Sequence, residues 1–350
     1  VNQAILIDHS KNGCLKDINV HNNTTTGNLI SITNSDLFTL SNVRVSENIL
    51  KRSVKPTDPI NAFFYIGGTD YVVMKCCEVS KNICTDSFAF SAFAFASGDD
   101  LKITESEFDF NGSFEAYSES VIGAQFATAN QLVIKNSTFN GNFAQKSQFV
   151  HGFHAEAVSK SSIDKCEANN TTLQISEAIE TTNLVPLFGT SGFYLLACSL
   201  LCLTEISANE TTQVKNACLA TGNLNGSAGI ELVLSDNNLI KKSTFNKSTL
   251  GAVDELNCKL STNFACGVLD MCSSSNSFEE CEACKILSCE DAYGFFIKDS
   301  KLNNYFKCSA NQESGLKKAI GFICLGTSKE TFKDCCGNNN NSEISGYGFG

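Results

Sequence analysis

The feature of this sequence that most constrains its fold is a repeat of about 32 residues. In each repeat a small residue, usually glycine, opens an apolar run, and an apolar anchor residue stands eleven positions later. The openings are Leu29, Ala62, Ala92, Gly123, Gly152, Gly192, Gly229, Gly267, Gly294, Gly321 and Gly348. The anchors are Leu15, Leu40, Val73, Ile103, Ile134, Ile163, Leu203, Ile240, Phe278, Tyr305 and Phe332. The repeat therefore runs through nearly the whole chain.

A second recurring pattern follows each anchor. Three positions on, the residue is small or β-branched; two further on it is apolar in most repeats, and asparagine soon follows. Glu78 departs from this pattern. A β-bulge that brings Val79 to the apolar position in place of Glu78 would restore it. Two short strands and an Asn-rich turn can bury their faces only by stacking on neighbouring repeats. We therefore predict an all-β fold, a right-handed single-stranded parallel β-helix of about eleven coils spaced about 4.8 Å apart.

The repeat predicts a single domain over residues 1–350. Its longest insertions, near 171–190, 210–227 and 247–264, belong to consecutive coils and should emerge on one side of the solenoid. Such insertions either form a binding surface or only lengthen the loops. Neither end shows the polar cap that an isolated solenoid needs. We therefore expect a segment of a longer chain or assembly, with neighbouring coils or subunits at both ends.

The charge of the chain excludes some classes of partner. The net charge is −11, and the two arginines, Arg44 and Arg52, lie close together. A nucleic-acid partner is not expected, because phosphate binding needs a basic stripe. Anionic polysaccharide is disfavoured for the same reason. Two apolar stretches, FAFSAFAFA and FYLLACSLLCL, are about half the ~20 residues of a transmembrane helix, so no membrane span is expected.

The repeat resembles a known family. Its pattern is similar to the right-handed parallel β-helix of the pectin-lyase-like superfamily, and more narrowly to the repeats of polymorphic outer membrane proteins. FDFN (Phe108 to Asn111) and FNGN (Phe139 to Asn142) match the FxxN turn of those repeats, and SAGIEL, YGFFI and IGFICL are degenerate forms of their GGAI strand. The resemblance implies a cell-surface adhesin.

Candidate catalytic or metal-binding residues are few. His151 and His154 are three apart on an expected strand and should point to opposite faces, so they are not expected to share a metal. Glu105, Glu107 and Asp109 form a carboxylate row that favours a solvated acidic face over a Ca²⁺ site. The polygalacturonase motifs are absent as such, and no catalytic residue, metal or cofactor is expected.

The 18 cysteines suggest two structural roles. Cys281, Cys308 and Cys335 occupy the same inward position in successive repeats and predict a ladder of buried thiols, since their Cβ atoms would be slightly too far apart for disulfides. The candidates for disulfides between the long insertions are Cys198, Cys202, Cys218, Cys258, Cys266 and Cys272.

Several Asn-x-Ser/Thr sequons lie in predicted turns or loops. Asn111, Asn209, Asn225 and Asn246 are the candidate glycosylation sites, provided that the source is eukaryotic. The even cysteine count and the sequons indicate an extracellular or cell-surface location.

These observations favour a non-enzymatic extracellular or cell-surface solenoid that is structural and adhesive. Its expected partners are a host-cell or matrix protein, or a glycan, bound through the insertion loops. A polysaccharide-processing enzyme of the pectin-lyase-like fold is the alternative interpretation. A filament or spike subunit that stacks end to end is the third.

Overall fold

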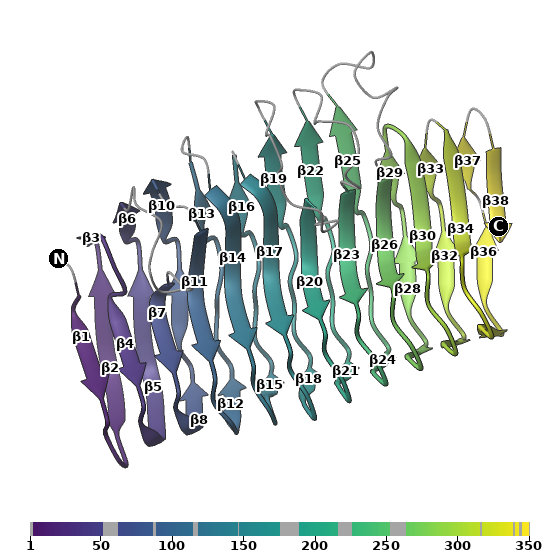
Figure 1. Ribbon diagram of the computed structural model, residues 1–350. Helices are drawn as coiled ribbons and strands as arrows, with labels where there is room; N and C mark the ends of the chain where they lie inside the picture. The colour runs from purple at the N-terminus through teal and green to yellow at the C-terminus, as the bar shows by residue number, and fades with distance from the viewer. Residues whose placement is uncertain are drawn as a thin grey trace.

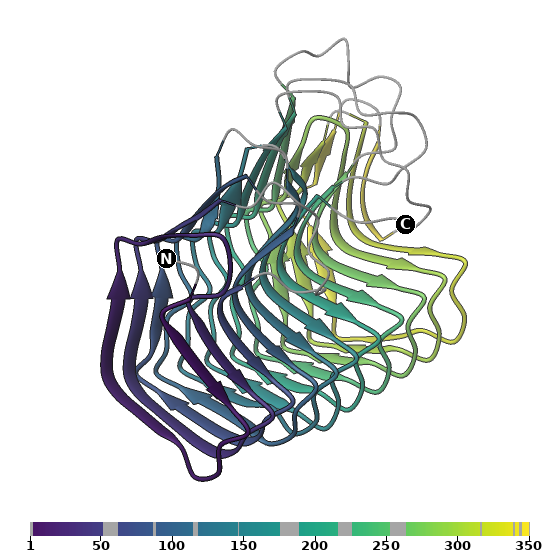
Figure 2. The same ribbon diagram turned by 60° about the vertical axis from the view of Figure 1, so that its left-hand side comes forward.

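A computed structural model describes residues 3–51, 62–86, 89–114, 118–145, 147–175, 189–215, 226–252, 264–315, 317–338, 340–342 and 345–349. The chain is a right-handed parallel β-helix of about eleven coils, and its described strands pair in parallel from coil to coil. Like strands lie side by side along the rod (Figure 1), and successive coils repeat one outline (Figure 2). The fold predicted from the repeat is confirmed.

Three long sheets run along the rod. Sheet A contains β1 (Ile5–Asp8), β4 (Ile30–Thr33), β7 (Ala62–Gly67), β11 (Ala89–Ala96), β14 (Ser118–Ala127), β17 (Ser147–Glu156), β20 (Thr190–Leu196), β23 (Gly226–Val233), β26 (Phe264–Met271), β30 (Asp291–Lys298), β34 (Lys318–Leu325) and β38 (Ser345–Phe349). Sheet B contains β2 (Cys14–His21), β5 (Asp36–Ser46), β8 (Asp70–Lys75), β9 (Glu78–Ser80), β12 (Leu101–Thr104), β15 (Val133–Lys135), β18 (Ser162–Asp164), β21 (Cys202–Thr204), β24 (Leu239–Lys241), β27 (Ser277–Glu279), β31 (Asn304–Phe306) and β35 (Thr331–Lys333).

Sheet C is made of the shortest strands. It contains β3 (Thr24–Thr25), β6 (Ile49–Lys51), β10 (Ile83–Asp86), β13 (Gly112–Ser113), β16 (Phe143–Ala144), β19 (Thr172–Ile175), β22 (Thr212–Lys215), β25 (Thr249–Ala252), β29 (Leu287–Ser288), β33 (Ser314–Gly315) and β37 (Asn341–Ser342). A small fourth sheet joins β28 (Glu282–Cys284), β32 (Ser309–Asn311) and β36 (Cys336–Asn338).

Sheet C corrects the two-strand repeat expected from the sequence. Its strands β19, β22 and β25 begin inside the segments expected to be insertions, and they pair with one another in register. Strands of two to four residues are too short to show an alternating pattern. The remaining parts of those segments, 176–188, 216–225 and 253–263, lie outside the described residues. Their emergence on one side of the rod stays a prediction.

The glycine of the repeat is required by close packing inside the coil. A Cβ on Gly267 would lie 2.4 Å from the Cβ of Ala283 and 2.8 Å from the carbonyl oxygen of Phe245. A Cβ on Gly192 would lie 2.5 Å from the Cβ of Ala208. Real Cβ atoms do not approach this closely, so any side chain here would force the sheets apart.

The core consists of apolar side chains stacked coil upon coil. Phe108 and Phe139 stack with ring centroids 5.3 Å apart, and Phe295 and Phe322 stack at 4.7 Å. One apolar cluster of buried residues extends from Val20 to Phe322. Each core side chain covers the equivalent side chain of the neighbouring coil, which explains why the same residue types recur in every coil.

The register of one coil differs from the sequence prediction by one residue. Met74, not Val73, pairs with Leu40 and Ile103, and Val73 is 41% exposed. The buried positions that follow are accordingly Cys77 and Val79, in place of Cys76 and Glu78. The opening of that coil moves as well, from Ala62 to Phe63, whose carbonyl oxygen accepts the Leu29 N–H. The shift explains the out-of-place Glu78 without the predicted bulge.

The described part of the chain contains no helix long and apolar enough to cross a membrane.

Candidate binding surface

Each coil enters sheet C through a sharp corner. One residue there has a left-handed backbone, such as Asn170 (φ 58°), Glu210 (φ 62°) or Lys247 (φ 59°). In these three coils the residue before it is half-buried and the residue after it is buried. The corner therefore has an inner and an outer position in each coil, and asparagine occupies both at different places along the rod.

The inner positions near the N-terminus form an inner ladder of Asn48, Asn82, Asn111 and Asn142. Each side-chain oxygen accepts the backbone N–H of the preceding ladder residue, at 3.1 Å from Asn82 to Asn111 and 3.1 Å from Asn111 to Asn142. The side-chain nitrogen of Asn111 also donates to the Val79 carbonyl oxygen at 2.8 Å. These amides satisfy buried backbone groups at the turn, as a buried corner requires.

The outer positions further along the rod form an outer ladder of Asp109, Asn140, Asn169, Asn209 and Asn246. Here the bonds run in the opposite direction, because each side-chain oxygen accepts the N–H of the following coil. The distance is 2.8 Å from the nitrogen of Asn209 to Asn169 and 2.9 Å from the nitrogen of Asn246 to Asn209. The amides of this ladder are partly exposed. The side-chain nitrogens of Asn169 and Asn246 donate to the carboxylates of Glu167 and Glu282 at 3.1 Å and 3.4 Å.

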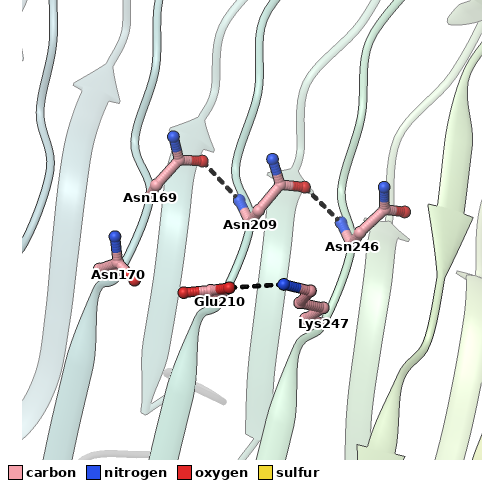
Figure 3. Close-up of a pocket in the computed structure, with 6 residues that line it drawn as sticks. All are labelled: Asn169, Asn170, Asn209, Glu210, Asn246 and Lys247. Carbon is pink, nitrogen blue, oxygen red and sulfur yellow. Dashed lines mark hydrogen bonds and ion pairs between the residues drawn. The ribbon is translucent and has the colours of Figure 1, made fainter.

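The outer ladder borders a polar groove of about 380 Å³. Its lining residues, drawn in Figure 3, are Asn169, Asn170, Asn209, Glu210, Asn246 and Lys247. The Lys247 ammonium lies 2.6 Å from the Glu210 carboxylate, and both side chains are about half exposed. Charge in the groove is therefore paired, and the other lining side chains are neutral amides.

Exposed aromatic side chains continue the same corner toward the N-terminus. Phe110 is 55% exposed and Phe114 is 38% exposed. The ring of Phe114 packs on Phe143 with centroids 4.6 Å apart. A Cβ on Gly141 would lie 2.5 Å from the Phe110 ring, so the glycine lets this ring lie flat against the next coil. We call these three phenylalanines and the six groove residues the corner strip.

Carboxylates of the predicted row have separate partners in the structure. Asp109 accepts hydrogen bonds from the Thr138 hydroxyl at 2.8 Å and the Asn140 N–H at 2.6 Å. Burial raises its pKa to about 6. Glu105 instead points toward Lys75, at 3.7 Å. Among the described residues, no three His, Cys, Asp or Glu side chains are placed to hold a metal ion.

His151 and His154 lie on the same face of sheet A, contrary to the sequence prediction. Their ring centroids are 5.3 Å apart. Between them, Gly152 and Phe153 both face the interior: Phe153 packs in the core, and a Cβ on Gly152 would lie 3.1 Å from the Cβ of Ala168. Two consecutive inward residues interrupt the alternation on which the prediction rested.

The two histidines belong to a buried polar cluster with Tyr194 and Glu231 from the next two strands. The Tyr194 ring stacks on His151 at 4.5 Å and contacts His154 at 4.8 Å, and Glu231 pairs with Tyr194 in register. Burial lowers the pKa of His154 to about 4 and raises that of Glu231. Within the described part of the chain, neither Glu231 oxygen has a hydrogen-bond partner. This cluster could not be predicted from the sequence, because the strands that contribute to it lie about 40 residues apart.

The cysteines predicted to form a ladder occupy the same position in three successive coils. Cys281 and Cys308 are buried and Cys335 is half-buried. The thiol of Cys308 donates to the Phe278 carbonyl oxygen at 3.4 Å, and that of Cys335 donates to Tyr305 at 3.3 Å. A hydrogen bond with Cys281 and burial raise the pKa of Cys308 to about 12, which makes its thiol a poor nucleophile.

The cysteines proposed for disulfides are placed differently. Cys198 and Cys266 are buried free thiols, and Cys202 and Cys272 are exposed free thiols. Cys218 and Cys258 lie outside the described residues. Bridges between the insertions stay a prediction.

The candidate glycosylation sites divide between the two ladders. Asn111 is fully buried, and its side-chain nitrogen, where a glycan would be attached, is bonded to Val79. This placement contradicts glycosylation of Asn111 in the folded chain. Asn209 and Asn246 are half-exposed on the outer ladder and stay candidates. Asn225 lies outside the described residues.

Solved β-helices resemble this chain only in fold. The periplasmic alginate epimerase AlgG is 12% identical to this chain, with a TM-score of 0.48. The match covers 92% of this chain and 74% of AlgG. The mannuronan C-5 epimerase AlgE6 A-module of Azotobacter vinelandii is 9% identical with a TM-score of 0.33, covering 96% and 89%. PfbA, a surface adhesin of Streptococcus pneumoniae, is 8% identical with a TM-score of 0.27, covering 95% and 85%.

No protein-family model matches the sequence, and no curated protein matches it. The solved structures include both enzymes and an adhesin, so function must be argued from the residues of this chain.

Proposed function

We propose that this chain is a non-enzymatic, structural and adhesive β-solenoid of the extracellular space or cell surface, and that it binds its partner through the corner strip. The observation that carries the proposal is the outer ladder. Over successive coils it presents half-exposed amides at a fixed spacing on a rigid support, beside exposed aromatic rings. Function in solenoids concentrates on such a repeated outer surface.

The packing of the strip supports binding in preference to catalysis. Its backbone is held by the ladder bonds, so little conformational entropy is lost when a partner binds. Aromatic and amide side chains supply contact area and hydrogen bonds, the combination typical of recognition surfaces. The ion pair of the strip, Glu210 with Lys247, is about half exposed to solvent and is not enclosed as a catalytic pair would be.

An adhesion assay tests the proposal. Beads coated with the chain are applied to a layer of cultured epithelial cells, and bound beads are counted. We expect the double variant Asn209→Ala/Lys247→Ala to reduce binding at least fivefold. The matched control is Glu280→Ala/Lys307→Ala, which removes a half-exposed ion pair of 3.9 Å at another corner. Equal losses in both variants, or no loss in the first, would contradict the proposal.

The buried cluster on sheet A favours a second candidate function, a polysaccharide-processing enzyme. Two histidines, a tyrosine and a glutamate within neighbouring strands are the groups from which an acid–base site is made. The test is release of shorter or unsaturated chains from polysaccharides by the purified protein. Activity that disappears in Tyr194→Phe, with the fold intact, would favour the enzyme over the adhesive solenoid.

A further inference from the structure

The corner strip also indicates the chemical class of its partner. We infer, resting on the proposed adhesive function, that the strip binds an extended neutral glycan. A sugar ring has an apolar C–H face and a rim of hydroxyl groups that both donate and accept hydrogen bonds. The strip offers aromatic rings at one end and amides along the rest, and a column of threonine hydroxyls lies beside it.

The aromatic end of the strip is built to hold its rings at the surface. Phe110 lies over Gly141 of the next coil, and Phe143 lies over Gly112 of the preceding coil, where a Cβ would be 2.7 Å from the ring. Each ring is therefore supported by bare backbone and fixed without being buried. A fixed, exposed ring supplies contact area at low entropic cost, which suits stacking by a flat ligand.

The polar end supplies hydrogen-bonding groups at each coil. Thr172, Thr212 and Thr249 occupy one outward column of sheet C beside the groove, and their hydroxyls make only long bonds of 3.4–3.5 Å to carbonyl oxygens two residues back. The Asn209 side-chain oxygen is used by the next coil, which leaves its nitrogen as the outward group. Hydroxyls and amides about 4.8 Å apart form a periodic row for a polymer with many hydroxyl groups.

Charge separates a neutral glycan from an acidic one. Glu210 and Lys247 neutralise each other, and the remaining side chains of the strip carry no charge. The chain as a whole has a net charge of −11. An acidic polysaccharide would be repelled by the chain and would find no unpaired cation among the described residues of the strip.

The backbone argues against an extended peptide as the occupant. A peptide that adds as a strand needs an unpaired sheet edge. At this corner the N–H groups of Asn209 and Asn246 are already bonded to side chains of the preceding coil. The strand edges beside the strip are paired with the neighbouring coils.

The inference is tested by isothermal titration calorimetry on the chain produced in bacteria, which leaves Asn209 and Asn246 without glycans. The probes are hexasaccharides of cellulose, chitin and mannan, with an alginate hexasaccharide as the anionic comparison. We expect at least one neutral probe to bind at least tenfold more tightly than alginate. Phe110→Ala should weaken that binding at least tenfold, and Phe110→Tyr should retain it.

The matched control is Phe306→Ala, a partly buried ring on sheet B that lies 5.0 Å from the Lys307 ammonium. Its binding should equal that of the parent chain, and circular dichroism should show each variant folded. Binding of no neutral probe, tighter binding of alginate, or equal loss in Phe306→Ala would overturn the inference. If bead adhesion still depends on Asn209 and Lys247 when no neutral probe binds, the adhesive function stands and only the glycan fails.

Discussion

The inner ladder and the outer ladder stabilise the same corner with the same residue type, yet they differ in what they leave at the surface. Asn82 and Asn111 turn inward and are fully buried, and the outer position of their coils is held by Ser80 and Asp109. Asn169 and Asn209 turn outward, and the inner position is then filled by Thr171 and Thr211. One ladder therefore serves the fold, while the other serves the fold and also forms a polar surface.

The two ladders overlap in two coils, where Asp109 and Asn140 are on the outer ladder and Asn111 and Asn142 are on the inner ladder. In the coils that follow Asn142, no row of asparagines occupies the inner position among the described residues. At Glu313 it holds a fully buried carboxyl group whose pKa burial raises to about 8. Inside and outside positions of the corner should therefore respond very differently to substitution.

The largest expected effect is that of Glu313→Gln at high pH. In the folded chain Glu313 keeps its proton up to about pH 8, whereas in the unfolded chain it ionises near pH 4.5. The folded state binds more protons between these values, so the parent loses stability as pH rises from about 4.5 to 8. The variant avoids this loss and should be more stable at pH 8 by up to about 4 kcal/mol.

Urea denaturation at pH 5 and pH 8 measures this difference. Glu282→Gln is the control, because that side chain is exposed at the outside of the coil. If Glu313→Gln raised the free energy of unfolding by the same amount at pH 8 and at pH 5, Glu313 would not carry a buried proton.

The next largest effect is expected at the glycines. Gly267→Ala places a methyl group 2.4 Å from the Cβ of Ala283, and overpacking of this kind costs roughly 1–3 kcal/mol. Gly251→Ala is the outside counterpart, since no atom lies within 4 Å of its Cβ position. We expect its thermal midpoint to be unchanged or slightly higher. Equal destabilisation of the two variants would refute the close approach of the sheets at Gly267.

The smallest effect on stability is expected for Lys247→Ala. Its ion pair with Glu210 is half-exposed, and such pairs contribute less than about 1 kcal/mol. The denaturation midpoint should stay close to that of the parent and of Lys307→Ala. A large loss of stability would mean that the groove is a structural element of the corner.

The repeat predicted the coils because glycine and the anchors face the interior, where packing dictates the residue type. It placed Gly123 to Gly348 in the correct column, since the residues on either side of these glycines pair in register along sheet A. It failed at Val73, where Met74 is the buried neighbour and both residues are apolar. It also failed at His154, because a Gly-Phe pair that points inward twice cannot be distinguished by composition from ordinary alternation.

The candidate site was less predictable than the fold. The sequence predicted a binding surface on the insertion loops and not at Asn169, Asn209 and Asn246, although each of these opens a sequon and precedes a left-handed residue. An asparagine turns outward when it precedes the left-handed residue and inward when it follows that residue. The sequence alone does not mark which residue adopts the left-handed conformation, so Asn111 and Asn209 looked equivalent.

The most direct test of the two-ladder account is a comparison of Asn111→Ala with Asn209→Ala in urea denaturation at neutral pH. Asn111→Ala leaves the buried N–H of Asn82 and the carbonyl of Val79 without partners, which should cost roughly 3 kcal/mol. Asn209→Ala leaves the N–H of Asn246 within reach of water and should cost less than about 1 kcal/mol. Equal losses of unfolding free energy, or a larger loss for Asn209→Ala, would contradict the claim that the inner ladder serves the fold alone while the outer ladder also forms a surface.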